Sequence, residues 1–251
     1  MEHKAPPAEY LNTAQGQLAY LRREGRSPGL LWLGGYASDM RGTKAEALDA
    51  HAAETGLSYL RFDYSGHGES DGGFEEGTIG RWAEDAAQIL AHLTDGPQIL
   101  VGSSMGAWIA GLLARTYPER IAGMILIAPA PDFTTELTPK QWAPEMMERL
   151  HKDGRLEIPS EFDDSVMVYT KALFDDGATN RVLSEPLPVN APVRILTGMR
   201  DDVVPYAHAL RYAEHLGTDD VRVTLVKDGD HRMSGEGELQ LLRQAVDELA
   251  R

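Results

Sequence analysis

The stretch QILVGSSMGAWIAGLL, residues 98–113, decides the fold of this chain. It opens with an apolar run typical of a buried strand, passes through Gly102-Ser103-Ser104-Met105-Gly106, and continues as an apolar pattern typical of a helix. Gly-x-Ser-x-Gly between a strand and a helix indicates a nucleophile elbow, a strained turn that exposes the serine hydroxyl. The N–H groups at the start of the helix favour negative charge there. The sequence therefore predicts Ser104 as a nucleophile.

The same five-residue pattern occurs a second time, at Gly68-Glu69-Ser70-Asp71-Gly72. This copy lies several residues beyond an apolar run and is followed by Gly73-Phe74-Glu75-Glu76-Gly77, where no helical pattern begins. Its two acidic neighbours would also oppose the formation of an alkoxide-like serine. We therefore interpret the segment around Ser70 as a loop without catalytic chemistry.

Short apolar runs alternate with helical patterns along most of the chain, which predicts βαβ units and a mostly parallel sheet with helices on both faces. Segments 10–13 and 18–21 flank a turn at Gln15-Gly16 and predict an antiparallel hairpin at one sheet edge. The predicted strands are 30–33, 57–62, 98–101, 122–128, 193–196 and 221–226, and the predicted helices are 44–55, 79–93, 107–115, 206–216 and 236–249.

The predicted alternation stops between Asp132 and about Pro188, where we predict no strand. We expect a mainly helical cap over residues 132–188, inserted into a single domain that spans residues 1–251. Large apolar side chains in this insertion could line an acyl pocket or pack the cap onto the body. They are Trp142, Met146, Met147, Phe162, Met167 and Phe174.

A serine nucleophile needs a base, and the base needs an acid that holds its tautomer. In the α/β-hydrolase fold these partners follow the serine in the order acid, then histidine. His231 lies in a loop directly after the strand at 221–226 and is the predicted base, whereas His208 and His215 share one helix face and are interpreted as surface or packing residues. Asp201 and Asp202 both follow the strand at 193–196; Asp201 is preferred because Gly-x-x-Asp-x-x-Val-Pro is an arrangement typical of this fold.

The tetrahedral oxyanion needs two N–H donors. One is the backbone N–H of the residue after the nucleophile, here Met105, and the other comes from the loop after the strand at 30–33. That loop reads Gly34-Gly35-Tyr36, so the Tyr36 N–H is the predicted second donor, with Gly35 as the alternative.

Composition narrows the remaining function classes. The 251 residues carry a net charge of −15, which disfavours binding to nucleic acid or to an anionic membrane surface. The chain contains no cysteine, so disulfides, thiolate metal sites and a cysteine nucleophile are excluded. Residues 1–10 are polar and resemble neither a signal peptide nor a transit peptide, and no run approaches the roughly 20 apolar residues of a membrane span. A cytoplasmic protein is expected, and its oligomeric state is not predicted.

Six segments carry a sequence resemblance: residues 33–36, 61–70, 77–82, 101–106, 127–133 and 198–205. Together they resemble one subfamily of the α/β-hydrolases. This is the subfamily of the mycophenolic-acid acyl-glucuronide esterase, also described as a palmitoyl-protein thioesterase, and its bacterial relatives. The resemblance implies a Ser-Asp-His hydrolase of carboxylic esters or thioesters, with Ser104, Asp201 and His231 in those roles. One segment departs from a common pattern, since Gly34-Gly35-Tyr36 stands where many α/β-hydrolases have His-Gly. His67, in the segment 61–70, is interpreted as a scaffold residue and not as a catalytic one.

The predicted activity is acyl transfer to water through a Ser104 acyl-enzyme, with an acyl ester or thioester as the small-molecule substrate and no metal or organic cofactor. A serine at the elbow disfavours the epoxide and dehalogenation reactions that use an aspartate there. An amidase or a C–C bond hydrolase would use the same three residues, and these alternatives stay open. So does a ligand-binding protein that keeps the fold without turnover, which would not react with a fluorophosphonate.

Overall fold

The computed structural model describes residues 6–159 and 166–251. Its centre is an eight-stranded sheet in the order β1-β2-β4-β3-β5-β6-β9-β10, in which β2 is antiparallel to both neighbours and the pairs from β4 to β10 are parallel. The predicted parallel sheet and N-terminal hairpin are thereby confirmed. The strands are β1 (Glu9–Thr13), β2 (Gly16–Arg23), β3 (Arg26–Leu33), β4 (Leu57–Phe62), β5 (Gln98–Ser103), β6 (Ile121–Ile127), β9 (Val193–Gly198) and β10 (Val221–Val226).

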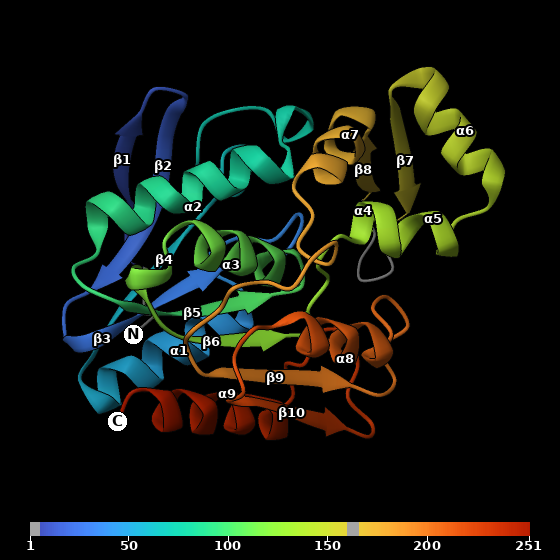
Figure 1. The fold of residues 1–251 in the computed structure, drawn as a ribbon. Coiled ribbons are helices and arrows are strands. Elements are labelled where there is room, and N and C mark those ends of the chain that lie inside the picture. The colour runs from blue at the N-terminus through green and yellow to red at the C-terminus, as the bar shows by residue number, and fades with distance from the viewer. Residues whose placement is uncertain (1–5, 160–165) are drawn as a thin grey trace.

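Helices cover both faces of this sheet (Figure 1). Successive side chains of a strand point to opposite faces, so Leu31 and Leu33 of β3 join the core on one face while Leu30 and Trp32 join the core on the other. The first core is closed by α2 (Ile79–Leu93), α3 (Met105–Thr116) and α8 (Tyr206–His215), and the second by α1 (Thr43–Thr55) and α9 (Glu236–Leu249). Two short 3-10 helices, η1 (Phe74–Glu76) and η2 (Pro118–Arg120), lie in connecting loops.

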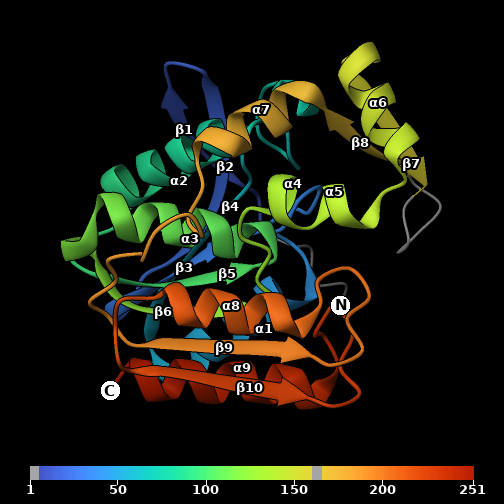
Figure 2. The same cartoon turned by 45° about the vertical axis from the view of Figure 1, so that its right-hand side comes forward.

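The chain between β6 and β9 forms the cap segment, which comprises the described residues of 132–188. It lies beyond the carboxyl ends of the central strands in both views (Figures 1 and 2), the position at which parallel sheets carry their sites. It contains α4 (Phe133–Glu136), α5 (Thr138–Gln141), α6 (Pro144–Asp153), β7 (Arg155–Pro159), β8 (Val166–Thr170) and α7 (Lys171–Thr179).

The expectation of a mainly helical cap is confirmed, but the antiparallel pair β7–β8 was not predicted. In β7 the apolar residues Leu156 and Ile158 alternate with Arg155 and Glu157, so the strand contains no continuous apolar run. One face of the hairpin is buried only because the body of the molecule lies beneath it, which a local sequence pattern does not reveal.

Polar contacts attach the cap segment to the body. The carboxylate of Glu136 lies 2.7 Å from Arg211 of α8, and this guanidinium lowers the pKa of Glu136 to about 2. Buried Asp132 accepts hydrogen bonds from the N–H groups of Val182 and Leu183, at 2.8 and 3.0 Å. The cap segment is thus bonded to α8 near its first residues, and Asp132 joins its two ends to each other.

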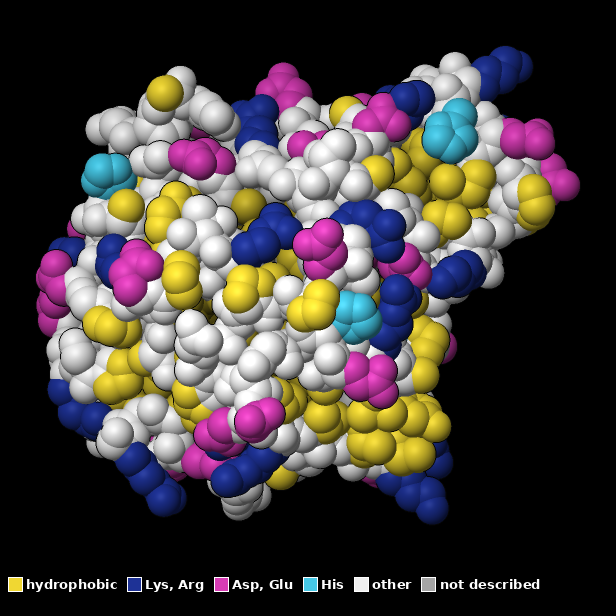
Figure 3. Space-filling view, viewed as in Figure 1, with side chains coloured by type: hydrophobic (Ala, Val, Ile, Leu, Met, Phe, Trp, Pro, Cys, Tyr) yellow, Lys and Arg dark blue, Asp and Glu magenta, His cyan; other side chains and the backbone are white. Residues whose placement is uncertain are grey.

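Charged side chains of both signs are interspersed over the face of the molecule shown in Figure 3. Hydrophobic side chains gather there in two places, over the cap segment and around the end of β10. Within residues 6–159 and 166–251, none of the helices combines the length and the apolar character that crossing a membrane requires.

Candidate active site

Ser104 lies on a strained turn between β5 and α3, with φ 53° and ψ −114°. Such a backbone is rare for a residue with a side chain and is maintained by its surroundings. A Cβ at Gly102 would lie 2.5 Å from the Gly106 carbonyl oxygen, and a Cβ at Gly106 would lie 2.0 Å from the Leu33 carbonyl oxygen. Both glycines of the motif are therefore required by close backbone packing, which turns the Ser104 side chain out of the sheet edge.

Three of the predicted site residues come together at this edge. The Nε2 atom of His231 lies 3.1 Å from the Ser104 Oγ, and its Nδ1 lies 2.8 Å from the Asp201 Oδ2. The Asp201 side chain is fully buried, and its second oxygen accepts the N–H groups of Val203 and Val204 at 3.0 and 2.7 Å. An acceptor at Nδ1 keeps a proton on that nitrogen, so the neutral ring presents Nε2 to the serine hydroxyl as an acceptor.

Asp202, the alternative acid, has an exposed side chain and lines the cavity described below. Of the two candidates, it is Asp201 that the structure places beside His231.

Two glycines bring the acid loop and the histidine loop into contact. A Cβ at Gly198, the last residue of β9, would lie 2.1 Å from the Gly229 carbonyl oxygen. That same oxygen accepts the N–H of Arg200 at 3.0 Å, directly before Asp201. After the histidine, the Met233 N–H donates to the Asp230 carboxylate at 3.1 Å. These bonds fix both loops beside Ser104.

The predicted oxyanion donors lie next to the serine. Met105 is the first residue of α3, so its N–H belongs to those that have no acceptor within the helix. A Cβ at Gly35 would lie 3.6 Å from the Ser104 Cβ, and the N–H of Tyr36 belongs to the peptide that follows Gly35. The Tyr36 phenol donates to the Val168 carbonyl of β8, and burial raises the pKa of Tyr36. Tyr36 thus connects the loop beside Ser104 with the cap segment.

A cavity of about 810 Å³ opens above Ser104 and His231. Of the cap residues singled out from the sequence, Trp142 and Met167 line it, whereas Phe174 is buried and packs against Trp142 at a ring distance of 5.7 Å. Met146 and Met147 pack against the core, and Phe162 lies outside the described residues. Further lining residues, which the sequence patterns did not single out, are Phe133, Leu137, Ile158, Val166 and Tyr169.

Ser70, His208 and His215, which were not assigned a catalytic role, are hydrogen-bonded to the backbone of the scaffold. The Ser70 hydroxyl accepts the Ala19 N–H at 2.8 Å and donates to the Asp63 carbonyl at 2.7 Å, within a loop, as predicted. His208 is buried and bonded through Nε2 to the Pro131 carbonyl at 2.7 Å, and burial lowers its pKa. The Nδ1 of His215 lies 2.8 Å from the Arg211 carbonyl oxygen. These contacts agree with the interpretation of both histidines as packing or surface residues.

Known proteins resemble this chain along nearly its whole length. A family model described as the alpha/beta hydrolase fold matches residues 32–155. The palmitoyl-protein thioesterase ABHD10 of Homo sapiens is 39% identical over 92% of this chain and 76% of its own length. Among solved structures, mouse alpha/beta hydrolase domain-containing protein 10 superposes with a TM-score of 0.90 at 36% identity, covering 97% of this chain and 98% of that one. A crystal structure from Agrobacterium vitis S4 gives a TM-score of 0.92 at 43% identity, with the same coverage.

These relatives also correct one prediction. The curated relatives from Bos taurus, Homo sapiens and Pongo abelii are all named as mitochondrial, so the expectation of a cytoplasmic protein is wrong. That expectation rested on the polar residues 1–10 and on the lack of a long apolar run, whereas the likeness to the mitochondrial proteins extends over 92% of the chain. On the strength of this likeness, and of the elbow, loops and sheet that agree with it, the chain belongs to the α/β-hydrolases, in the family of the palmitoyl-protein thioesterase ABHD10.

Proposed function

We propose that this chain hydrolyses acyl esters and thioesters through an acyl-enzyme on Ser104. The observation that carries the proposal is the continuous set of contacts from the Ser104 Oγ to His231 at 3.1 Å and on to buried Asp201 at 2.8 Å. Both distances fall within the hydrogen-bonding reach that a base needs to activate a nucleophile, about 2.6–3.2 Å.

The first step forms the acyl-enzyme. Nε2 of His231 takes the hydroxyl proton as Ser104 attacks the acyl carbonyl carbon. The tetrahedral intermediate collapses by breaking the bond to the leaving oxygen or sulfur, which receives the proton from His231. Asp201 stabilises the imidazolium that exists between these two proton transfers.

The second step releases the acid. Water enters beside His231, gives up a proton to Nε2 and attacks the acyl carbon, and Ser104 leaves with that proton restored. In both steps the negative oxygen would be held by the N–H groups of Met105 and Tyr36. Each donor of this kind typically contributes about 100- to 1,000-fold to the rate. The loop that carries Tyr36 is therefore part of the proposed active site.

The lining of the cavity supports one orientation of the substrate. Apolar side chains gather around Tyr36, whose ring stacks on Tyr169 at 5.2 Å, and Trp142 lies 4.9 Å from Tyr169 in turn. Polar groups gather beside His231, where the Lys44 ammonium donates to the Arg232 carbonyl at 2.6 Å. Since His231 must protonate the leaving group, we infer that the leaving group lies on the polar side and the acyl chain under the cap segment.

The names of the relatives point to the same acyl class. The human and bovine proteins are called palmitoyl-protein thioesterases, and a palmitoyl chain is the kind of apolar group that an aromatic-lined cavity accepts. We therefore propose long-chain acyl groups as substrates, attached through either an ester or a thioester.

Hydrolysis of a matched panel tests this function. p-Nitrophenyl esters with two to sixteen acyl carbons, and acyl thioesters of the same chain lengths, should be turned over, with the highest kcat/KM among the longer chains. Amide analogues of the same chains distinguish an amidase, and a vinylogous diketone distinguishes a C–C bond hydrolase. A wild-type protein that hydrolyses none of the esters or thioesters would refute the proposal.

Two neighbouring aspartates supply the matched variants. Asp201→Asn should lower kcat by about 10⁴-fold, because the amide would favour the wrong histidine tautomer. Asp202→Asn, one residue away and exposed, should change kcat by less than about tenfold. The reverse ranking would mean that the acid has been assigned to the wrong residue.

A further inference from the structure

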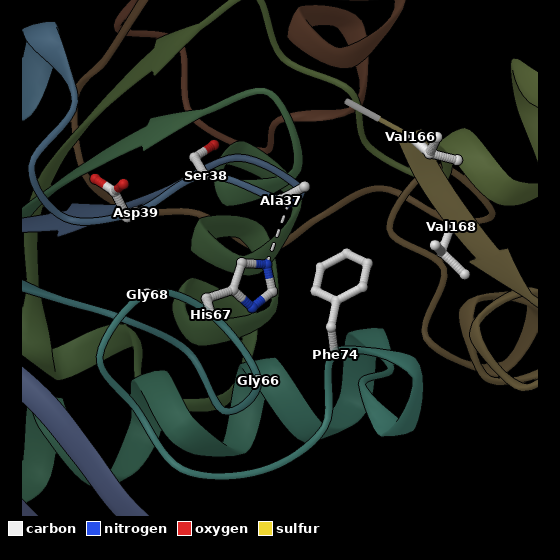
Figure 4. A pocket seen from close by; sticks show the side chains of 9 residues that line it. All are labelled: Ala37, Ser38, Asp39, Gly66, His67, Gly68, Phe74, Val166 and Val168. Carbon is white, nitrogen blue, oxygen red and sulfur yellow. Dashed lines mark hydrogen bonds between the residues drawn. The ribbon is translucent and has the colours of Figure 1, made fainter. Parts of the chain in front are cut away.

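Behind the loop that carries Tyr36 lies a second pocket, of about 310 Å³ (Figure 4). Ala37, Ser38 and Asp39 line both this pocket and the large cavity above Ser104, so the loop forms part of the wall of each. His67, which stands in the stretch DYSGHG at residues 63–68, lines the small pocket and is only 4% exposed. The proposed hydrolytic steps leave this buried histidine without a role.

His67 holds the loop by a hydrogen bond of defined direction. Its Nδ1 lies 3.3 Å from the Ser65 carbonyl oxygen, which can only accept, so Nδ1 carries the proton. Nε2 is then an acceptor, and it receives the N–H of Ala37 at 3.3 Å, the dashed line in Figure 4. Burial lowers the pKa of His67 to about 4, so the ring remains neutral and keeps this acceptor at neutral pH.

The Ala37 peptide belongs to a tight turn with strained geometry. The Ser38 N–H donates to the Gly35 carbonyl at 3.2 Å, which closes a four-residue turn over residues 35–38. Ala37 occupies its third position with φ 55°, as in a type II turn, where glycine is the usual residue. Rotation of the Tyr36–Ala37 peptide would relieve this strain, and it would turn the Ala37 N–H away from His67.

On its Nδ1 side, the His67 ring is bonded to Ser65, whose backbone is fixed by two residues of the core. The Ser65 N–H donates to buried Asp85 of α2 at 2.8 Å, and the indole N–H of Trp82 donates to the Ser65 carbonyl at 3.1 Å. The ring of His67 also packs edge-on against Phe74 and Trp82, at 5.0 and 5.1 Å. His67 therefore connects α2, through Ser65, with the turn over residues 35–38, which would otherwise relax.

We propose that His67 is a positioning residue for the oxyanion hole. By accepting the Ala37 N–H it keeps the turn over residues 35–38 in its strained form. The first peptide of this turn, Gly35–Tyr36, carries the Tyr36 N–H, so a fixed turn keeps this donor in place for the oxygen of the tetrahedral intermediate. It contacts neither the substrate nor Ser104. This inference rests on the proposed function, in which Tyr36 supplies one of the two donors.

Two substitutions separate the hydrogen bond from the packing. His67→Phe keeps a ring against Phe74 and Trp82 but has no acceptor, and the neighbouring small pocket leaves space for the larger ring. His67→Gln carries an amide oxygen that can accept the Ala37 N–H. We expect His67→Phe to lower kcat by about 10- to 100-fold with KM within about threefold of wild type, as for a misplaced catalytic donor. His67→Gln should recover at least part of that loss.

A third substitution tests the strain itself. Adding Ala37→Gly to His67→Phe should restore kcat severalfold, because glycine adopts a positive φ without cost and no longer needs His67 to hold the turn. Melting temperatures of all variants show that the differences in kcat belong to folded protein. If His67→Phe does not fold, the length-matched pair His67→Gln and His67→Met makes the same comparison, and only the methionine variant should lose kcat.

The proposal is overturned if folded His67→Phe, or its methionine counterpart, retains the wild-type kcat. It is also overturned if the glutamine variant is as slow as the variant without an acceptor, because the loss would then not depend on the hydrogen bond. Failure of the proposed function looks different: the wild-type protein itself would show no turnover that depends on Ser104.

Discussion

Residues 68–72 and residues 102–106 carry the same Gly-x-Ser-x-Gly pattern, yet their serine hydroxyls have different hydrogen-bond partners. Ser70 is hydrogen-bonded to backbone on both sides, to Ala19 of β2 and to the carbonyl of Asp63, which directly follows β4. Ser104 is turned outward by backbone packing, with its hydroxyl 3.1 Å from His231. The glycines of the pattern permit tight backbone in both places. The flanking elements therefore decide what each serine can contact: Ser104 lies between a strand and a helix, whereas Ser70 lies within a loop.

Removing each serine in turn tests this contrast most strongly. Ser104→Ala should lower kcat/KM for p-nitrophenyl esters by about 10⁴-fold or more and abolish labelling by a fluorophosphonate, because no nucleophile remains. Ser70→Ala should label at the wild-type rate and serves as the matched control. Labelling that survives in Ser104→Ala and disappears in Ser70→Ala would reverse the assignment.

The last glycines of the two motifs should differ in stability. Gly106→Ala forces a Cβ to within 2.0 Å of the buried Leu33 carbonyl oxygen, so we expect a loss of about 3 kcal/mol or more in the free energy of unfolding. In Gly72→Ala the nearest atom to the new Cβ is the end of the Arg81 side chain, at 3.3 Å, and the cost of about 1–2 kcal/mol comes mainly from the positive φ of 98°. Urea unfolding of both variants measures the difference, and equal losses would show that the motif is packed alike in both places.

The loop that contains Ser70 should also make stability depend on pH, through His67. Burial lowers the pKa of His67 from 6.5 to about 4, so the unfolded chain binds more protons between these values. The stability that comes from the neutral ring is therefore fully present above pH 6.5 and is lost as the pH falls toward 4, by up to roughly 3 kcal/mol. Unfolding of the wild type relative to His67→Gln, followed from pH 7 to 4, isolates this loss. A difference that does not change with pH would contradict it.

The smallest effect is expected from Ser70→Ala on stability. The substitution leaves the Ala19 N–H without its side-chain acceptor, which should lower the free energy of unfolding by about 1–2 kcal/mol. Ser70→Thr, which keeps a hydroxyl, should lose less if the hydrogen bonds account for the effect. Denaturant midpoints of the two variants provide the measurement. An unchanged midpoint in Ser70→Ala would mean that the hydrogen bonds of this hydroxyl do not contribute to stability.

Most of the layered fold could be predicted because its signals are local. Buried parallel strands such as β5 are continuous apolar runs, and amphipathic helices such as α2 have apolar residues at helical spacing. The hairpin β7–β8 was not predicted: β7 alternates polar with apolar residues, and the apolar run of β8, Val166–Tyr169, was not recognised as a strand because it is only four residues long and its partner strand carries no apolar run. Ile158 and Tyr169, one from each strand of this hairpin, line the cavity and were therefore missed together with it.

The sequence by itself determined the strand–serine–helix elbow, the order of acid and base after it, and the tight glycines that the elbow requires. These follow from backbone sterics and local periodicity, which neighbouring residues encode. Only the tertiary structure decided that His231 lies 3.1 Å from a serine 127 residues earlier, that Asp201 rather than Asp202 contacts it, and that His67 supports the turn over residues 35–38. Those contacts arise because parallel strands bring their carboxyl ends to one edge, which joins loops that are far apart along the chain.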